Sequence, residues 1–173
     1  MNPASDEHPR LPGPLSARDL LRRQFRLAHT LLETAVEQFP TDAFHRGPSG
    51  MAAPTGARYA QVVLCEDLSV NGLLARGTPL ALSAWAGRTG LSELPPLVGT
   101  VDWRAWAHRV RLDRAKLRRY AQAVYASTDV YIAALAEEEL TTAGGDAPLR
   151  LLSGLLLSLS MRRGEIACLL ELS

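Results

Sequence analysis

The sequence has few cysteines and almost no lysine. Its two cysteines, Cys65 and Cys168, are far apart, form no CxxC pattern and lie in apolar helical surroundings, so we expect buried free thiols. Lys116 is the only lysine among 19 lysine and arginine residues. The formal net charge of +1 gives no bulk attraction to nucleic acid or to an anionic membrane.

Several recognisable segments and motifs are missing. The N-terminus has no charged region followed by an apolar one, so no signal peptide is indicated. The longest uncharged apolar stretch, residues 151–161, is too short to span a bilayer. We therefore expect a cytoplasmic protein with no membrane partner. The chain also lacks a Walker motif, a dinucleotide fingerprint and a G-x-S-x-G elbow.

What is present fits one globular domain. The 173 residues are 47% apolar and 21% charged, which is an ordinary balance for a folded chain of this length. Residues 1–14 contain four prolines and are predicted to form a flexible tail. Residues 15–173 are predicted to form the folded domain.

Apolar periodicity predicts two helices in the first half of that domain. Ser16 and Asp19 resemble a capping box, and apolar residues then recur at three- and four-residue steps until Pro40. A glycine- and proline-rich loop is predicted over residues 41–56. The second helix is predicted over residues 58–76, before a glycine and a proline that end it.

Two more helices are predicted in the second half. A long connection over residues 80–100 precedes them, and Trp85 is expected to anchor it to the core. The third helix is predicted over residues 102–139 and the last over residues 149–172, with a Gly-Gly turn between them. With no alternating strand pattern, the sequence predicts an all-α four-helix bundle with a long crossover between helices 2 and 3. The last helix is apolar on nearly every side until Met161, which is typical of a helix that is central in its domain or that packs against a second subunit, as in a homodimer.

Three segments resemble the DinB-like family of metalloenzymes. They are YAQVVLCEDLSVNGLL at residues 59–74, DWRAWAHRV at 102–110 and GEIACL at 164–169, which are similar to parts of that family's second, third and fourth helices. The resemblance covers nearly the whole chain after the tail and implies a four-helix fold. It also implies a divalent metal held by one histidine of helix 2 and an H-x-x-x-H pair of helix 4.

This chain departs from the family at those metal ligands. The helix 2 ligand falls on Gln61 and the helix 4 pair on Ser158 and Arg162, none of which is histidine. Arg162 is permanently charged and has no lone pair to give to a cation. The four histidines (His8, His29, His45 and His108) share no helical face at ligand spacing, so we expect no metal and no other cofactor.

Two interpretations of this altered site stay open. In the first, Arg162 pairs with Glu66 or Glu165, and the former metal pocket becomes a satisfied polar core. In the second, the fixed charge of Arg162 replaces the charge of the metal, and the pocket binds a small anionic ligand such as a carboxylate. Both interpretations describe a non-catalytic protein with a binding or stress-associated role.

Two other functions remain as alternatives. The resemblance implies a metal- and thiol-dependent transferase or isomerase, as in characterised relatives of the family. Arg104, Arg111 and Arg118 recur at seven-residue steps and suggest a nucleic-acid-binding strip. A solvated helix face is the better interpretation of that strip, because the chain is near neutral and shows no stacking motif.

Overall fold

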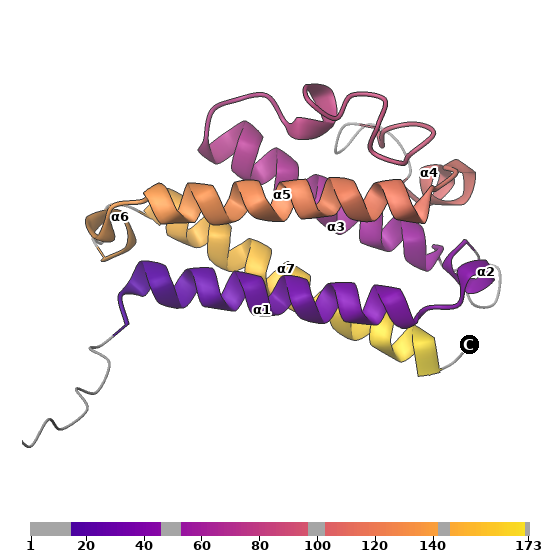
Figure 1. Cartoon of the computed structure of the whole chain (residues 1–173), viewed down its shortest axis with the longest axis horizontal. Helices are drawn as coiled ribbons and strands as arrows, with labels where there is room; N and C mark the ends of the chain where they lie inside the picture. Colours follow the sequence, from indigo (N-terminus) through magenta and orange to yellow (C-terminus); the bar gives the residue numbers. More distant parts are fainter. Residues whose placement is uncertain (1–14, 46–52, 97–102, 142–145, 172–173) are drawn as a thin grey trace, which may run out of the picture.

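Four helical segments, α1, α3 with its extension, α5 and α7, form most of the structure. The computed structural model describes residues 15–45, 53–96, 103–141 and 146–171 (Figure 1). The longest elements are α1 (Ala17–Gln38), α3 (Thr55–Asp67) with its π-helical extension η2 (Leu68–Leu74), α5 (Arg114–Ala134) and α7 (Asp146–Glu171). Shorter elements are α2 (Thr41–Phe44), η3 (Leu80–Leu82), α4 (Trp103–Arg109) and α6 (Glu137–Thr141).

The described residues confirm the all-α fold class. Within these segments β pairing is limited to one isolated bridge, between Leu91 and Leu112. No helix in the described part of the chain has the length and apolar character needed to cross a membrane. The predicted tail at residues 1–14, the middle of the predicted 41–56 loop and the predicted Gly-Gly turn lie outside the described residues.

Each of the four long helical segments packs against two of the others. Helix α1 packs against α5 and α7, and α3 packs against the same two helices (Figure 1). Arg18, near the start of α1, donates a hydrogen bond to the Leu135 carbonyl after α5, and Arg114, at the start of α5, donates one to the Phe39 carbonyl after α1. These contacts join opposite ends of the two helices, so α1 and α5 are antiparallel.

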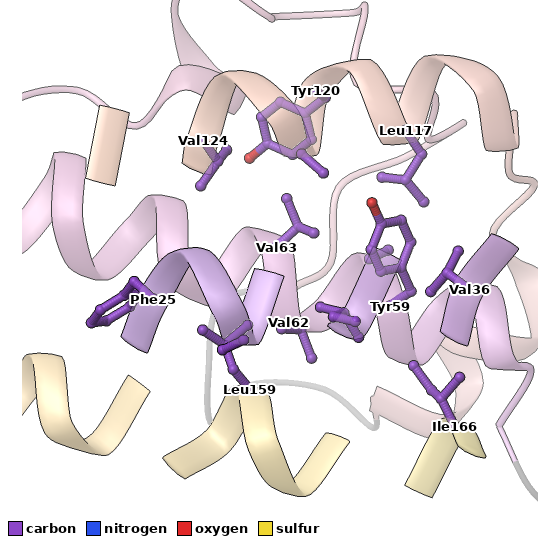
Figure 2. Packing of buried hydrophobic residues seen from close by; sticks show 14 of the residues in the cluster. Phe25, Val36, Tyr59, Val62, Val63, Leu117, Tyr120, Val124, Leu159 and Ile166 are labelled. Carbon is purple, nitrogen blue, oxygen red and sulfur yellow. The ribbon is translucent and has the colours of Figure 1, made fainter. Parts of the chain in front are cut away.

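All four long helices contribute to a single apolar core. Figure 2 shows Phe25 and Val36 from α1, Val62 and Val63 from α3, and Leu117 and Val124 from α5 turned toward one another. Leu159 and Ile166 close the core from α7 and are almost completely buried. Burying each such side chain stabilises the fold by about 1.5–3 kcal/mol before the cost of ordering the chain.

Local signals set the bounds of α1 as predicted. The Ser16 hydroxyl accepts a hydrogen bond from the Asp19 backbone N–H at 3.1 Å, which satisfies one of the donors exposed at the start of the helix. The helix ends at Gln38, two residues before Pro40. The second predicted helix begins three residues earlier than expected, at Thr55, and its last turns are π-helical.

The prediction of one continuous third helix over residues 102–139 was wrong. The chain leaves helical geometry after Arg109, and α5 begins only at Arg114. Between them, Leu112 pairs with Leu91, and the Asp113 backbone N–H donates to the Gly90 carbonyl at 2.7 Å. The Asp113 carboxylate then accepts from the Lys116 N–H at 3.0 Å and caps α5. A second break, at Leu135, separates α5 from α6.

Gly90 makes this break possible. Its φ of +85° is favoured only for glycine, and a Cβ built there would lie 2.6 Å from the Leu117 nitrogen. The connection from residue 80 therefore lies directly against the start of α5. Trp85 packs half-buried against the core, with its ring centroid 5.9 Å from that of Tyr120, so the prediction that it anchors the connection is confirmed.

Helix α7 has one buried face and one exposed face. Leu152, Leu159 and Ile166 point into the core, whereas Leu157 and Met161 are 63% and 60% exposed. The helix begins at Asp146, three residues before the predicted start. Residues 151–161 are apolar on nearly every side of the helix, but within the described chain Leu157 and Met161 stay uncovered.

Candidate functional site

Two arginines and one glutamate meet where α3 packs against α7. Arg58 of α3 and Arg162 of α7 each place one guanidinium nitrogen on the same oxygen, Oε2 of Glu165, at 3.0 and 2.7 Å. The side chains of Arg58 and Arg162 are 23% and 32% exposed, so solvent still reaches them. We call this group of Arg58, Arg162 and Glu165 the α3–α7 cluster.

The α3–α7 cluster carries a net positive charge. Partial burial raises the pKa of Glu165, but its hydrogen bond to Arg162 and the charges of Arg162 and Arg58 outweigh this effect and lower the pKa below its usual value. Glu165 is therefore ionised at neutral pH, and two guanidinium groups face one carboxylate. Each guanidinium has five N–H donors and uses one nitrogen for Glu165, and Arg58 also donates from Nε to the Ala53 carbonyl. Donors therefore remain on both side chains for an incoming anion.

The structure separates the five residues that the sequence placed at the altered metal site. Arg162 and Glu165 are in contact, while Gln61 is half-buried on α3 and Ser158 is exposed on α7. Glu66 lies apart from the cluster. It is completely buried, and its carboxylate contacts His29 of α1 and Thr128 of α5. Of the two carboxylates proposed as partners of Arg162, the structure pairs it with Glu165.

These side chains do not fit the divalent metal that the family resemblance implies. A three-ligand site needs lone-pair donors on facing helices, but Arg162 offers only donors and is already bonded to Glu165. Among the described residues, no group of three or more His, Cys, Asp or Glu side chains could hold a metal ion. The residues at this position therefore provide no ligand set on which a metal-dependent step could depend.

A buried polar network fills the interior between α1, α3 and α5. Its first part joins Glu66 to His29 and Thr128: the His29 Nε2 lies 3.0 Å from Glu66 Oε2, and the Thr128 hydroxyl donates to Oε1 at 2.6 Å. The ring of Tyr125 stacks on His29 with centroids 3.8 Å apart. Glu66 is thus held from two helices while it is fully excluded from water.

The second part of the network surrounds Asp67. Its carboxylate accepts hydrogen bonds from the Tyr120 hydroxyl at 2.6 Å and from the Asn71 amide at 2.8 Å. It also accepts from the backbone N–H groups of Leu80 and Ala81, both at 2.8 Å. Four donors therefore satisfy one buried carboxylate and attach the connection after η2 to the core.

A third part lies at Glu33 of α1. This carboxylate accepts from the hydroxyls of Tyr59 and Tyr125, at 2.5 and 3.1 Å, and from Nε of Arg118 at 2.9 Å. Burial, reinforced by the negative charge of Glu33, raises the pKa of Tyr59 far above its usual value, so this phenol stays protonated and remains a donor.

Sequence reasoning did not find this network. The signal available was the Glu66-Asp67 pair inside an otherwise apolar helical run, LCEDLSV. Two adjacent carboxylates in such a run require buried partners, since an unpaired buried charge is very costly. The partners themselves lie on other helices, 37 and more residues away in sequence, except for the nearby Asn71 and the residues at 80 and 81.

An apolar pocket of about 140 Å³ opens on the outer side of α3. Cys65 lines it, and burial raises the pKa of this thiol while the positive charge of Arg162 partly opposes the rise. Both cysteines are free thiols, but the prediction that they are buried was wrong, because Cys65 is half-buried and Cys168 is exposed. The pocket walls come from α3, η2, the connection and α4, and include Leu64, Leu68, Ala81, Leu82, Leu94 and Trp103.

The arginine strip suggested by the sequence does not form one helical face. Arg104 lies on α4 and Arg111 in the break, so the seven-residue spacing does not continue along a single helix to Arg118. Arg118 binds Glu33 and Glu37 at 2.9 and 3.3 Å. Arg114 donates to backbone carbonyls at the C-terminal end of α1 and lies over the Phe44 ring. Arg114 and Arg118 thus have structural partners that link α5 to α1 and α2.

Comparison with known proteins supports the fold and leaves the function open. The structure is similar to the crystal structure of a conserved protein from Enterococcus faecalis, with a TM-score of 0.75 over 92% of this chain and 98% of that one. The two sequences are 19% identical, so the similarity concerns the fold alone. No family model matches the chain. No curated protein matches it either.

Proposed function

We propose that this chain is a DinB-like four-helix bundle that binds a small anionic ligand at the α3–α7 cluster and does not catalyse a metal-dependent reaction. The observation that carries the proposal is the convergence of Arg58 and Arg162 on one oxygen of Glu165. Two fixed positive charges against one negative charge leave a local excess of one positive charge at a half-exposed site. The contacts of α1 and α3 with both α5 and α7 support the bundle, with the connection after η2 as its crossover.

The charge arrangement favours a carboxylate as the ligand. A guanidinium presents parallel N–H donors that match the two oxygens of a carboxylate, and such charge-assisted hydrogen bonds are about twice as strong as neutral ones. Half-buried Gln61, on the same helix as Arg58, adds an amide that can donate to the same anion. The free thiols of Cys65 and Cys168 fit a reducing compartment such as the cytoplasm.

Replacing Arg162 with glutamine is expected to abolish most of the anion binding. A screen of formate, acetate, malonate and benzoate by thermal shift, followed by calorimetry of the acids that raise Tm, measures this directly. Loss of one charged hydrogen-bonding partner costs about 1.5–3 kcal/mol, so the affinity should fall at least about tenfold. Arg163→Gln is the matched control, because Arg163 is the exposed neighbour on α7 and its replacement removes the same charge.

Two results would overturn this proposal. One is that every acid that binds does so equally well to the wild type, Arg162→Gln and Arg163→Gln. The other is elemental analysis of the purified protein that finds about one divalent ion per chain. That second result would favour the metal- and thiol-dependent transferase or isomerase implied by the family resemblance.

We further propose that the exposed face of α7 packs against a second copy of this chain. Residues 151–161 carry no charge, and Leu157 and Met161 are more than half exposed on that face. Gly154 has open space where a Cβ would be, and it lines a mainly apolar groove of about 420 Å³ together with Leu73, Leu74, Arg150, Leu151 and Leu155. Antiparallel pairing of two α7 helices about Leu157 would place Met161 of each copy over Gly154 of the other.

Leu157→Glu is expected to convert a dimer into a monomer. The substitution places one negative charge from each copy at the centre of an apolar contact. Burying an unpaired carboxylate there is unfavourable by roughly several kcal/mol. Sedimentation velocity of both proteins at matched concentration measures the change. Leu27→Glu is the control, since Leu27 is 60% exposed on α1. A monomeric wild type, or a variant that stays dimeric, would contradict the pairing of α7 helices.

A further inference from the structure

We infer that the anionic ligand also carries an apolar group of about the size of one aromatic ring, and that this group enters the pocket beside Cys65. The inference rests on the proposed anion binding at the α3–α7 cluster and adds the chemical class of the ligand: a small aryl or short-chain carboxylate. It is carried by the position of Cys65, which lines the apolar pocket and lies seven residues after Arg58 of the α3–α7 cluster on the same helix.

The pocket has the size and lining for a single ring. Its volume is about 140 Å³, and an apolar protein cavity of about 150 Å³ is known to bind benzene. Leucine, proline and tryptophan side chains form most of its walls. Leu68, Leu82 and Leu94 are 43%, 62% and 38% exposed, so the mouth of the pocket presents apolar surface to solvent. An apolar group that entered would remove this surface from water.

Asp67 restricts which charge a group bound in the pocket can carry. Among the described residues it is the one carboxylate in the lining, and its oxygens already accept from Tyr120, Asn71 and two backbone N–H groups. It therefore has little acceptor capacity for a cationic ligand, while its negative charge repels an anionic group placed deep in the pocket. An amphipathic anion is thus oriented with its apolar end inside and its carboxylate toward Arg162.

One face of α3 connects the α3–α7 cluster with the pocket. Arg58 and Cys65 are seven residues apart on α3, which places them on one face two helical turns apart. Arg162 lies beside that face, because it shares the Glu165 carboxylate with Arg58. A ligand that spans from Arg162 to the pocket therefore passes Cys65 and shields it from solvent.

Protection of Cys65 from alkylation tests the inference on the wild-type protein. The rate of iodoacetamide labelling at each cysteine is followed by mass spectrometry with phenylacetate, acetate or benzyl alcohol at equal concentration. Phenylacetate is expected to slow labelling of Cys65 at least about fivefold and to bind at least about tenfold more tightly than acetate, because its ring is buried. The exposed Cys168 serves as the internal control and should label at the same rate in every sample.

Two variants separate the apolar group from the charge. Leu82→Asp places a second carboxylate at the exposed rim of the pocket and should abolish protection by phenylacetate while acetate still binds. Arg162→Gln should abolish protection as well, because the anionic end loses its partner. Ala86→Asp, at an exposed position of the same connection outside the pocket lining, is the control and should behave as the wild type.

The outcomes distinguish this inference from the proposed function. If acetate and phenylacetate bind equally, need Arg162 and leave Cys65 unprotected, the apolar pocket takes no part and the inference is wrong, while the anion site stands. If benzyl alcohol protects Cys65 as well as phenylacetate does, the pocket binds apolar groups without regard to charge, and the inference is again wrong. If no acid binds, both proposals fail.

Discussion

Asp67→Ala is expected to lower the free energy of unfolding by about 3–5 kcal/mol, because several buried donors lose their acceptor at a cost of about 1–3 kcal/mol each. The Asp67 carboxylate is 1% exposed in the folded chain and receives four hydrogen bonds. Its removal leaves a buried tyrosine hydroxyl and two backbone N–H groups without an acceptor. Urea denaturation at neutral pH measures the change, with the m-value as a check that the folded state stays compact.

Tyr120→Phe is the graded control for that measurement. It removes only one of the four hydrogen bonds to Asp67 and keeps the ring in the core, so about 1–2 kcal/mol should be lost. An Asp67→Ala variant no less stable than Tyr120→Phe would show that the backbone contacts at Leu80 and Ala81 contribute little. The attachment of the connection to α3 would then need another explanation.

The second large effect is expected at His29. His29→Leu should lower the free energy of unfolding by about 3 kcal/mol, because it leaves the fully buried Glu66 carboxylate with only the Thr128 hydroxyl. The substituted side chain fills much of the same space beside Phe25 and Tyr125, so little of the loss should come from packing. Chemical denaturation of the wild type and of His29→Leu measures the difference in the free energy of unfolding.

The double variant His29→Leu/Glu66→Leu decides whether the loss comes from the stranded charge. Replacing both members of a buried polar pair with apolar residues is often close to neutral, so the double variant should be more stable than His29→Leu alone. Strictly additive losses from the two single variants would mean that the pair itself is not coupled. The double variant leaves the Thr128 hydroxyl without an acceptor. Its free energy of unfolding should therefore stay about 1–3 kcal/mol below that of the wild type.

Helix positions could be predicted where the deciding signal lies within a few residues. Ser16 caps α1 from three residues away, and Pro40 prevents it from continuing, so both ends were found from the sequence. The break between α4 and α5 could not be found in this way, because it depends on Gly90 and Leu91, about 20 residues earlier in the chain. The apolar periodicity continues across the break and indicates one helix.

In the candidate site too, contacts between residues close in sequence could be predicted, and contacts between distant residues could not. Arg162 and Glu165 are three residues apart on α7, so their pairing is a local property that helical spacing allows one to anticipate. Arg58 joins them from 107 residues away, and nothing near it in the sequence indicates the contact. Glu66 was grouped with Arg162 on grounds of charge alone. Its actual partner, His29, is set by which face of α3 turns toward α1.

The attachment of the connection to Asp67 has a consequence for which substitutions the chain can tolerate. Asp67 binds residues 80 and 81 through their main-chain N–H groups, which every amino acid except proline possesses. These two hydrogen bonds therefore do not depend on the side chains at positions 80 and 81. A substitution at residue 80 or 81, other than by proline, therefore keeps the hydrogen bonds that attach the connection to α3.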